Sequence, residues 1–187
     1  MTDLITTAQE IQSFCEKQKW HFCIIGALAL QFWGEQRLTK DVDLTLLTGF
    51  GSEEKFIDRL LENFAARRED AKDFALQNRV VLLQTPDGIG IDISLAAFPF
   101  EEEMINRAEY QRYLPDICLK ICAVEDLIVL KAFADRGKDW NDIKTIIIKQ
   151  KQLDWDYINK LLPPLAEIKY TPEIITKLEN LRREFSK

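Results

Sequence analysis

Two aspartates separated by one residue, Asp41 and Asp43, are the strongest candidates for chemistry in this chain. Residues 42 to 47 are rich in strand-forming side chains, and residues two apart on a strand point to the same face, roughly 6 to 7 Å apart. Two neighbouring carboxylates repel each other unless a cation lies between them, and oxygen ligands of this kind suit Mg²⁺. Short Asp-x-Asp triplets also occur on solvated loops, so the surrounding residues must decide between the two readings.

Two other positions place suitable groups near this pair. Gly26 ends the apolar run at 22 to 25, and a glycine there lets a triphosphate approach the backbone amides of a helix start. Asp92 lies between two isoleucines, either on the exposed side of a half-buried strand or as a third metal ligand and the base for an attacking hydroxyl. Two metals about 4 Å apart, held by such carboxylates, align nucleophile, phosphorus and leaving pyrophosphate.

A sheet and several helices are needed to hold these residues in place. Short apolar runs, strand-forming composition and turn residues predict strands at 22 to 25, 42 to 47 and 117 to 122, and a hairpin of 78 to 84 with 89 to 95. Helical spacing and capping residues predict helices at about 7 to 18, opened by a Thr7–Glu10 capping box, at 27 to 33, at 52 to 66 and after Pro99.

The last third of the chain has a helical pattern throughout. Helices are expected at 124 to 136, at 139 to 150, after a cap at Asp154, and after Thr171, with Pro163 and Pro164 dividing the last two. The prediction is an α+β fold. Residues 1 to 122 form a mixed β-sheet flanked by helices, and a helical region at 123 to 187 packs on this core.

Composition limits the class of protein. The chain has 187 residues, of which 47% are hydrophobic, and its 30% charged residues are interspersed, so it can form a folded core. A net charge of −6 gives no overall attraction for nucleic acid, although a local basic patch remains compatible with it. We find no apolar run of about 20 residues and no signal-peptide pattern, which predicts a cytoplasmic protein without a membrane segment.

Cysteines, the single histidine and the paired arginines carry weaker signals. Four cysteines in apolar contexts predict buried free thiols, with zinc binding together with His21 as the minor alternative. A Ser-His or Cys-His hydrolase would have to use His21, and no neighbouring residue supports that. The pairs at 67 to 68 and 182 to 183 are typical of solvated helix ends.

The segment IIGALALQFWGEQRLTKDVDLTLL resembles the opening of the nucleotidyltransferase superfamily, particularly the branch of AbiEii-type toxins and small-molecule nucleotidyltransferases. In that branch a strand ends in Gly-Gly or Gly-Ser, a helix follows, and an Arg-x-Thr-x-Asp-x-Asp run carries the metal. The residues that match this run are Arg37, Thr39, Asp41 and Asp43. The resemblance implies Mg²⁺, a nucleoside triphosphate substrate, and nucleotide contacts from Gly26, Ala27, Arg37 and Thr39. Ala27 stands where the branch has Gly or Ser, so a hydroxyl for the phosphate is missing.

A later segment, VEDLIVLKAFADRGKDWNDI, is similar to the helices that follow in that branch, which carry a lysine and an Arg-x-Lys-Asp-x-x-Asp pattern. The matching residues are Lys131, Arg136, Lys138, Asp139 and Asp142. The resemblance implies that Lys131 contacts the nucleotide phosphates, while the two aspartates organise helix packing. From the residues alone, Lys131 needs an anionic partner, which is either a triphosphate or a carboxylate such as Asp135.

The sequence therefore predicts a Mg²⁺-dependent nucleotidyltransferase in which Asp41, Asp43 and Asp92 hold the metal and a nucleoside monophosphate passes to a hydroxyl. The acceptor is a small molecule, an RNA end or a protein, and a toxin-antitoxin role would add a protein antitoxin or RNA as partner. The alternative is an inactive member that acts as a binding module, because Ala27 replaces a motif residue.

Overall fold

The computed structural model describes residues 2 to 185 and contains one mixed sheet with the strand order β3-β4-β5-β2-β1-β7-β6. The strands are β1 (Phe22–Ile24), β2 (Asp41–Leu47), β3 (Ala65–Ala66), β4 (Val80–Gln84), β5 (Gly90–Ala96), β6 (Glu109–Leu114) and β7 (Ile117–Ile121). The helices are α1 (Thr2–Lys17), α2 (Gly26–Trp33), α3 (Glu53–Leu61), α4 (Ala71–Asn78), α5 (Pro99–Arg107), α6 (Val124–Ala134), α7 (Gly137–Lys149), α8 (Trp155–Lys169) and α9 (Glu173–Phe185).

The chain divides into two compact units. Unit 1 contains the residues up to Leu28 together with Leu38–Cys122, and unit 2 contains Ala29–Arg37 together with the residues from Ala123 onward. The division passes through α2, so the first turn of that helix belongs to unit 1 and the rest to unit 2.

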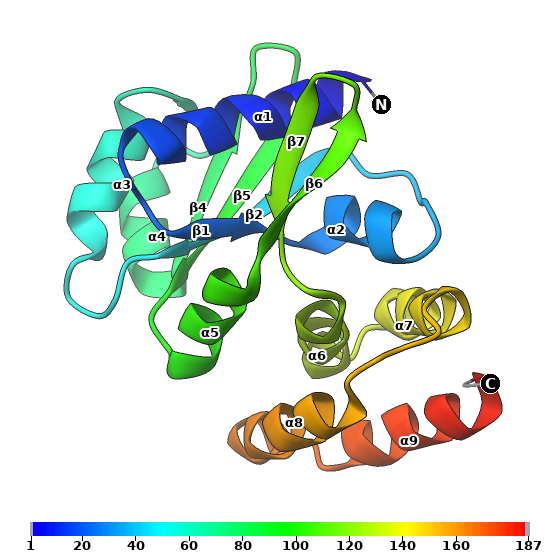
Figure 1. The fold of residues 1–187 in the computed structure, drawn as a ribbon. Coiled ribbons are helices and arrows are strands. Elements are labelled where there is room, and N and C mark those ends of the chain that lie inside the picture. The colour runs from blue at the N-terminus through cyan, green and yellow to red at the C-terminus, as the bar shows by residue number, and fades with distance from the viewer. Residues whose placement is uncertain (1, 186–187) are drawn as a thin grey trace. The chain divides into compact units, whose positions relative to one another are not determined.

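Unit 1 is built around the sheet. Strand β2 runs parallel to β5 and antiparallel to β1, and β1 runs parallel to β7. On β2 the side chains of Val42, Leu44 and Leu46 are buried, whereas Asp41 and Asp43 on the other face are partly exposed. This alternation follows from the two-residue period of a strand. Helix α1 lies along the sheet and contacts β2 and β7, while α3 and α4 pack together beside β4 (Figure 1).

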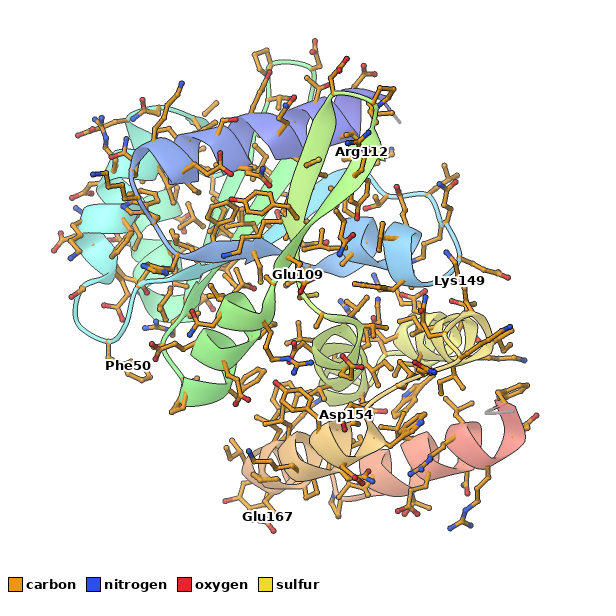
Figure 2. All side chains as sticks on the ribbon, in the orientation of Figure 1. Phe50, Glu109, Arg112, Lys149, Asp154 and Glu167 are labelled. Atoms are coloured by element: carbon orange, nitrogen blue, oxygen red, sulfur yellow. The ribbon has the colours of Figure 1, made fainter. Side chains whose placement is uncertain are left out.

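Unit 2 is helical. Helix α6 contacts α7, α8 and α9, and its buried residues point in several directions, as expected for a helix surrounded by others. On α7 a single buried stripe is formed by Ile143, Ile146 and Ile147. Lys149, labelled at the end of α7 in Figure 2, donates to the carbonyls of Phe32 and Gly34 at 3.1 and 2.9 Å and so holds the chain that leaves α2.

The structure confirms the α+β class and the helical character of the last third, but it corrects several element boundaries. Helix α1 begins at Thr2, so Thr7 lies inside it and forms no capping box. Helix α3 ends at Leu61 instead of 66, strand β3 occupies the last residues of that predicted helix, and α4 lies in a stretch that had no predicted element. Strand β6 was also missed because, as an edge strand with mostly polar, exposed side chains, it shows little hydrophobic alternation.

The last two helices also differ from expectation. Pro163 and Pro164 lie inside α8 and do not end it. Leu162 and Ala166 on either side of them are buried, so tertiary packing maintains the helix where local propensity opposes it. The cap by Asp154 is confirmed, since its carboxylate accepts a hydrogen bond from the Tyr157 amide at 2.9 Å.

The cysteines are free thiols, as predicted, but one of the four is exposed. Cys15, Cys23 and Cys122 are buried, whereas Cys118 lies on the outward face of β7. Burial raises the pKa of Cys15 to about 12, so this thiol stays protonated at neutral pH. Among residues 2 to 185, no helix is long and apolar enough to cross a membrane.

Candidate active site

The three predicted carboxylates lie on one face of the sheet, and we call Asp41, Asp43 and Asp92 the carboxylate cluster. Strands β2 and β5 pair in parallel with Asp43 directly beside Asp92 and with Asp41 beside Gly90. Directly paired residues point to the same face. The sequence alone does not reveal this pairing, because the register between two parallel strands depends on contacts distant in the chain.

Two glycines leave room for the carboxylates. Gly26 has a φ of +63°, and a Cβ at this position would lie 2.0 Å from the Asp43 Oδ2 atom. A Cβ at Gly90 would lie 2.1 Å from the Asp41 Oδ1 atom. A side chain at either glycine would therefore push a carboxylate out of its position. This adds a second reason for glycine at 26, beside the predicted approach of a phosphate.

Gly26 is also the first residue of α2, which follows β1. The amide of Ile25 donates to the Asp43 carbonyl at 2.9 Å, so the start of α2 is held against the middle of β2. Ala27 follows in the first turn and is buried, which places its methyl group in the core. The Thr39 hydroxyl lies within hydrogen-bond distance of the Asp41 carbonyl and amide, at 3.3 and 3.4 Å, and so orders the entry to β2.

Arg67 is the residue of this site that the sequence did not reveal. Its Nη2 atom is in direct contact with Asp92 Oδ1, and its Nη1 atom lies 3.6 Å from Asp41 Oδ1. The prediction of a solvated helix end is wrong for Arg67, because the residue follows the short strand β3. Two alanines form that strand, and their pattern is indistinguishable from the end of a helix.

The sheet register explains how Arg67 reaches the aspartates. The Arg67 amide donates to the Leu82 carbonyl at 2.9 Å, and Leu82 pairs with Asp92 on the next strand. With strands about 4.8 Å apart, an extended arginine spans the distance from the edge of the sheet to β5. Arg67, Asp41 and Asp92 are all about one-third to one-half exposed, so solvent and ions have access to them.

The cluster has suitable donors for a hard divalent cation, but its side chains do not converge on one point. In the part of the chain that the structure describes, no group of three or more His, Cys, Asp or Glu side chains could hold a metal ion. Two of the carboxylates instead face the guanidinium of Arg67. Carboxylate oxygens suit Mg²⁺, and the exposed side chains can rotate, so the residues fit such an ion without being preformed for it.

Unit 2 contains a second group of charges, Lys131, Asp139 and Asp142, which we call the buried ion cluster. The Lys131 ammonium lies 2.6 Å from Asp142 and 3.7 Å from Asp139. These side chains are between 0 and 7% exposed. Because Lys131 comes from α6 and both aspartates from α7, the ion pairs join these two helices. The prediction that Lys131 contacts nucleotide phosphates stays a prediction, and the anionic partners that the structure contains are carboxylates.

Two arginines extend the buried ion cluster towards its rim. The Nε atom of Arg37 donates to Asp142 at 3.2 Å, and the Nε atom of Arg136 donates to Asp139 at 2.5 Å. Arg37 belongs to unit 2, whereas Thr39, Asp41 and Asp43 of the same run belong to unit 1. The predicted nucleotide-contacting residues thus fall in both units, with Arg37 and Lys131 in one and Gly26, Ala27 and Thr39 in the other.

Comparison with protein families gives one match that spans the described chain. Residues 2–187 match the model of a family described as "Nucleotidyltransferase of unknown function (DUF6036)". No curated protein matches the chain.

Three solved structures are similar in fold at low sequence identity. The antibiotic-resistance factor ANT(2'')-Ia is 14% identical with a TM-score of 0.58, over 92% of this chain and 96% of that one. An antigenic nucleotidyltransferase-like protein from Paracoccidioides brasiliensis is 16% identical with a TM-score of 0.51, over 95% and 91%. The lincomycin-bound lincosamide antibiotic adenylyltransferase LnuA is 13% identical with a TM-score of 0.50, over 73% and 92%. These similarities confirm the predicted type of fold, a mixed sheet flanked by helices.

Proposed function

The chain belongs to the family described as nucleotidyltransferase of unknown function, and on this premise we propose that it transfers a nucleoside monophosphate from a nucleoside triphosphate to a hydroxyl acceptor. The observation that carries the proposal is the in-register pairing of Asp43 with Asp92, with Gly26 and Gly90 leaving space for the carboxylates. Such an arrangement suits a cation that must be shared with a phosphate, because the carboxylates stay accessible from one face.

The residues of unit 1 have distinct tasks in this proposal. Asp41, Asp43 and Asp92 would hold Mg²⁺, and Asp92 would accept the proton of the attacking hydroxyl. The hydroxyl oxygen forms a bond to the α-phosphorus while the bond to the leaving pyrophosphate breaks. The chemistry that Mg²⁺ would supply when bound is neutralisation of the charge that develops on the phosphate oxygens. The amides at the start of α2, including that of Ala27, donate to the triphosphate.

The acceptor class is narrowed by two observations. Two of the proteins with similar folds are an antibiotic-resistance factor and an adenylyltransferase with bound lincomycin, which supports a small molecule with a free hydroxyl. The net charge of −6 gives no general attraction for RNA. A small-molecule acceptor therefore comes first in an acceptor search, ahead of an RNA end or a protein.

A narrower proposal places the chain with the AbiEii-like toxins, as half of a toxin-antitoxin pair with a protein antitoxin or RNA as partner. It is supported by the run of Arg37, Thr39, Asp41 and Asp43. The alternative is an inactive member that serves as a binding module. Ala27 favours it, because no hydroxyl stands at this position for the phosphate.

Thermal unfolding with each of the four nucleoside triphosphates, with and without Mg²⁺, tests the proposal. We expect stabilisation of the wild type by one or more triphosphates only when Mg²⁺ is present, since a ligand that binds the native state stabilises it by about 2.7 kcal/mol at 100 times its Kd. Asp43→Asn should abolish this shift. The matched control is Asp87→Asn, which alters an exposed aspartate in the turn between β4 and β5 and should respond like the wild type.

The outcomes separate the two functions. A Mg²⁺-dependent shift that is lost in Asp43→Asn and kept in Asp87→Asn supports a working nucleotide site and identifies the base to use with candidate acceptors. No shift with any triphosphate at millimolar concentration would contradict the transferase proposal and favour the binding module.

A further inference from the structure

We propose that Arg67 is a built-in counter-ion of the carboxylate cluster that a divalent cation must displace, and that the displaced guanidinium then binds the triphosphate. The inference rests on the proposed function, because it assigns Arg67 a part in loading the same site. Its consequence is that metal and nucleotide bind well together, whereas metal alone binds weakly.

The contacts of Arg67 differ from those of its neighbour. Arg67 reaches across the sheet face to Asp92 and Asp41, which lie on two different strands. Arg68 instead pairs with Asp70 two residues away, at 2.8 and 2.9 Å, and stacks on Phe74. Of two adjacent arginines, only the first is therefore directed at the candidate metal ligands.

Charge explains why the cluster accepts either cation. The three carboxylates and one guanidinium carry a net charge of −2, which a single divalent ion neutralises. A metal bound to Asp41 and Asp92 would lie beside the Oδ1 atoms that Arg67 contacts, and the two cations would repel each other at such short separation. Binding of metal therefore weakens the attraction between the carboxylates and the guanidinium.

Arg67 can leave the aspartates without leaving the site. Its backbone is fixed by the hydrogen bond from its amide to the Leu82 carbonyl, while its side chain is about one-third exposed. A guanidinium favours bidentate contacts with phosphate oxygens. A triphosphate that arrives with the metal supplies that partner, so metal and nucleotide each favour binding of the other.

Binding of Mn²⁺ in the absence of nucleotide tests the displacement step. Free Mn²⁺ is measured by electron paramagnetic resonance with wild type, Arg67→Gln, Arg67→Lys and Arg68→Gln. We expect Arg67→Gln to bind Mn²⁺ about 5- to 10-fold more tightly than wild type, which is the low end of usual coupling factors. Arg67→Lys, which retains the charge, and Arg68→Gln, which alters the neighbouring arginine, should stay close to wild type.

A second titration tests the phosphate contact. With Mn²⁺ present, Arg67→Gln should bind a non-hydrolysable triphosphate analogue about 10-fold more weakly than wild type, while Arg68→Gln should bind it as wild type does. Loss of structure alone would weaken both Mn²⁺ and nucleotide binding, so the opposite signs of the two changes are specific to the proposed exchange.

The results also distinguish this inference from the proposed function. If the wild type binds Mn²⁺ and Arg67→Gln binds it equally or more weakly, the counter-ion role is overturned while the metal site stands. If neither the wild type nor Arg67→Gln binds Mn²⁺, both the metal site and the role of Arg67 are overturned. Binding by Arg67→Gln where the wild type binds little would support the counter-ion role in its strongest form.

Discussion

The carboxylate cluster of unit 1 and the buried ion cluster of unit 2 use the same chemistry in opposite ways. In the first, Arg67 contacts two of the three aspartates, Asp41 and Asp92, whose side chains are 45% and 34% exposed. In the second, Lys131 lies between two aspartates that are at most 7% exposed. The carboxylates of the first cluster are accessible to solvent, whereas the buried ion pairs of the second join two helices.

The contrast shows that the residues of the run from Arg37 to Asp43 have different structural roles. Arg37 donates to Asp142 of the buried ion cluster, while Asp41 and Asp43, a few residues later, form the exposed face of β2. A motif whose residues all look suited to ligand binding thus contains a residue that pairs with α7 and two aspartates on the partly exposed face of β2. The Arg37 side chain is itself 33% exposed, so it is the partner of each charge that distinguishes these two parts.

Removing a carboxylate from the buried ion cluster should have the largest effect on stability. Asp142→Ala leaves Lys131 buried without its nearest partner, and we expect the free energy of unfolding to fall by about 3 to 5 kcal/mol. Urea unfolding measures the change. Glu167→Ala, at an exposed position on α8 labelled in Figure 2, should alter it by less than about 0.5 kcal/mol. A cost below about 1 kcal/mol for Asp142→Ala would remove the distinction between the two clusters.

A glycine comparison sharpens the account of the carboxylate cluster. Gly26 and Gly88 both have positive φ, but only at Gly26 would a Cβ meet a neighbour, the Asp43 carboxylate, whereas nothing lies within 4 Å at Gly88. Alanine in a left-handed conformation costs about 1 to 2 kcal/mol, which we expect for Gly88→Ala, and Gly26→Ala should lower stability by about 1 kcal/mol more.

Metal binding provides the second readout for this pair of variants. Gly26→Ala should weaken Mn²⁺ binding because it displaces Asp43, and Gly88→Ala should leave Mn²⁺ binding unchanged. Equal unfolding energies and equal Mn²⁺ affinities for the two variants would mean that Gly26 serves only the backbone turn.

Much of this could be predicted from local sequence. Residues 42 to 47 are rich in strand formers, and the two-residue period of a strand correctly predicted that Asp41 and Asp43 are neighbours on one face. The same reasoning placed Asp92 on a strand of its own. These predictions succeeded because both segments are rich in strand-forming residues and are bounded by turn residues.

The remaining features depend on contacts distant in the chain. The direct pairing of Asp43 with Asp92 is set by a parallel register, which leaves no local signal. Arg67 follows a strand of two residues, too short for any periodicity. The partner of Lys131 was left open between a triphosphate and a carboxylate, because hydrophobic neighbours show only that an anion is required and cannot specify which one.

Away from this face of the sheet, unit 1 also carries exposed aromatic side chains. Phe50, labelled in Figure 2, follows the far end of β2 from Asp41 and packs edge-on against Phe98, with ring centres 5.3 Å apart. The guanidinium of Arg79 lies 4.8 Å from the Phe50 ring, and its Nη2 atom donates to the Gly49 carbonyl at 3.1 Å. Arg79 therefore stabilises the turn after β2, whereas Arg67 contacts the aspartates at the other end of that strand.

The smallest expected effect on stability concerns Asp135, a partly exposed residue at the end of α6. Its carboxylate accepts hydrogen bonds from the Lys177 ammonium at 2.8 Å and from the Trp140 indole at 2.7 Å. Hydrogen bonding to Lys177, followed by that to Trp140, holds the pKa of Asp135 below its ordinary value. A carboxylate whose pKa is lower in the folded state stabilises the fold above its unfolded pKa of about 3.9, and this contribution disappears as the pH falls through the folded pKa.

Asp135→Asn isolates this charge, since Asn also accepts the left-handed backbone conformation found here, with φ of 56°, and retains an oxygen acceptor for Trp140. We expect wild type to exceed the variant in unfolding free energy by about 0.5 to 1 kcal/mol at pH 7, as for other partly exposed ion pairs. In urea unfolding at pH 7, 5 and 3, the difference should persist at pH 5 and shrink at pH 3. A stability difference that is independent of pH would contradict a role for the Asp135 charge and would assign the stabilisation to hydrogen-bond geometry.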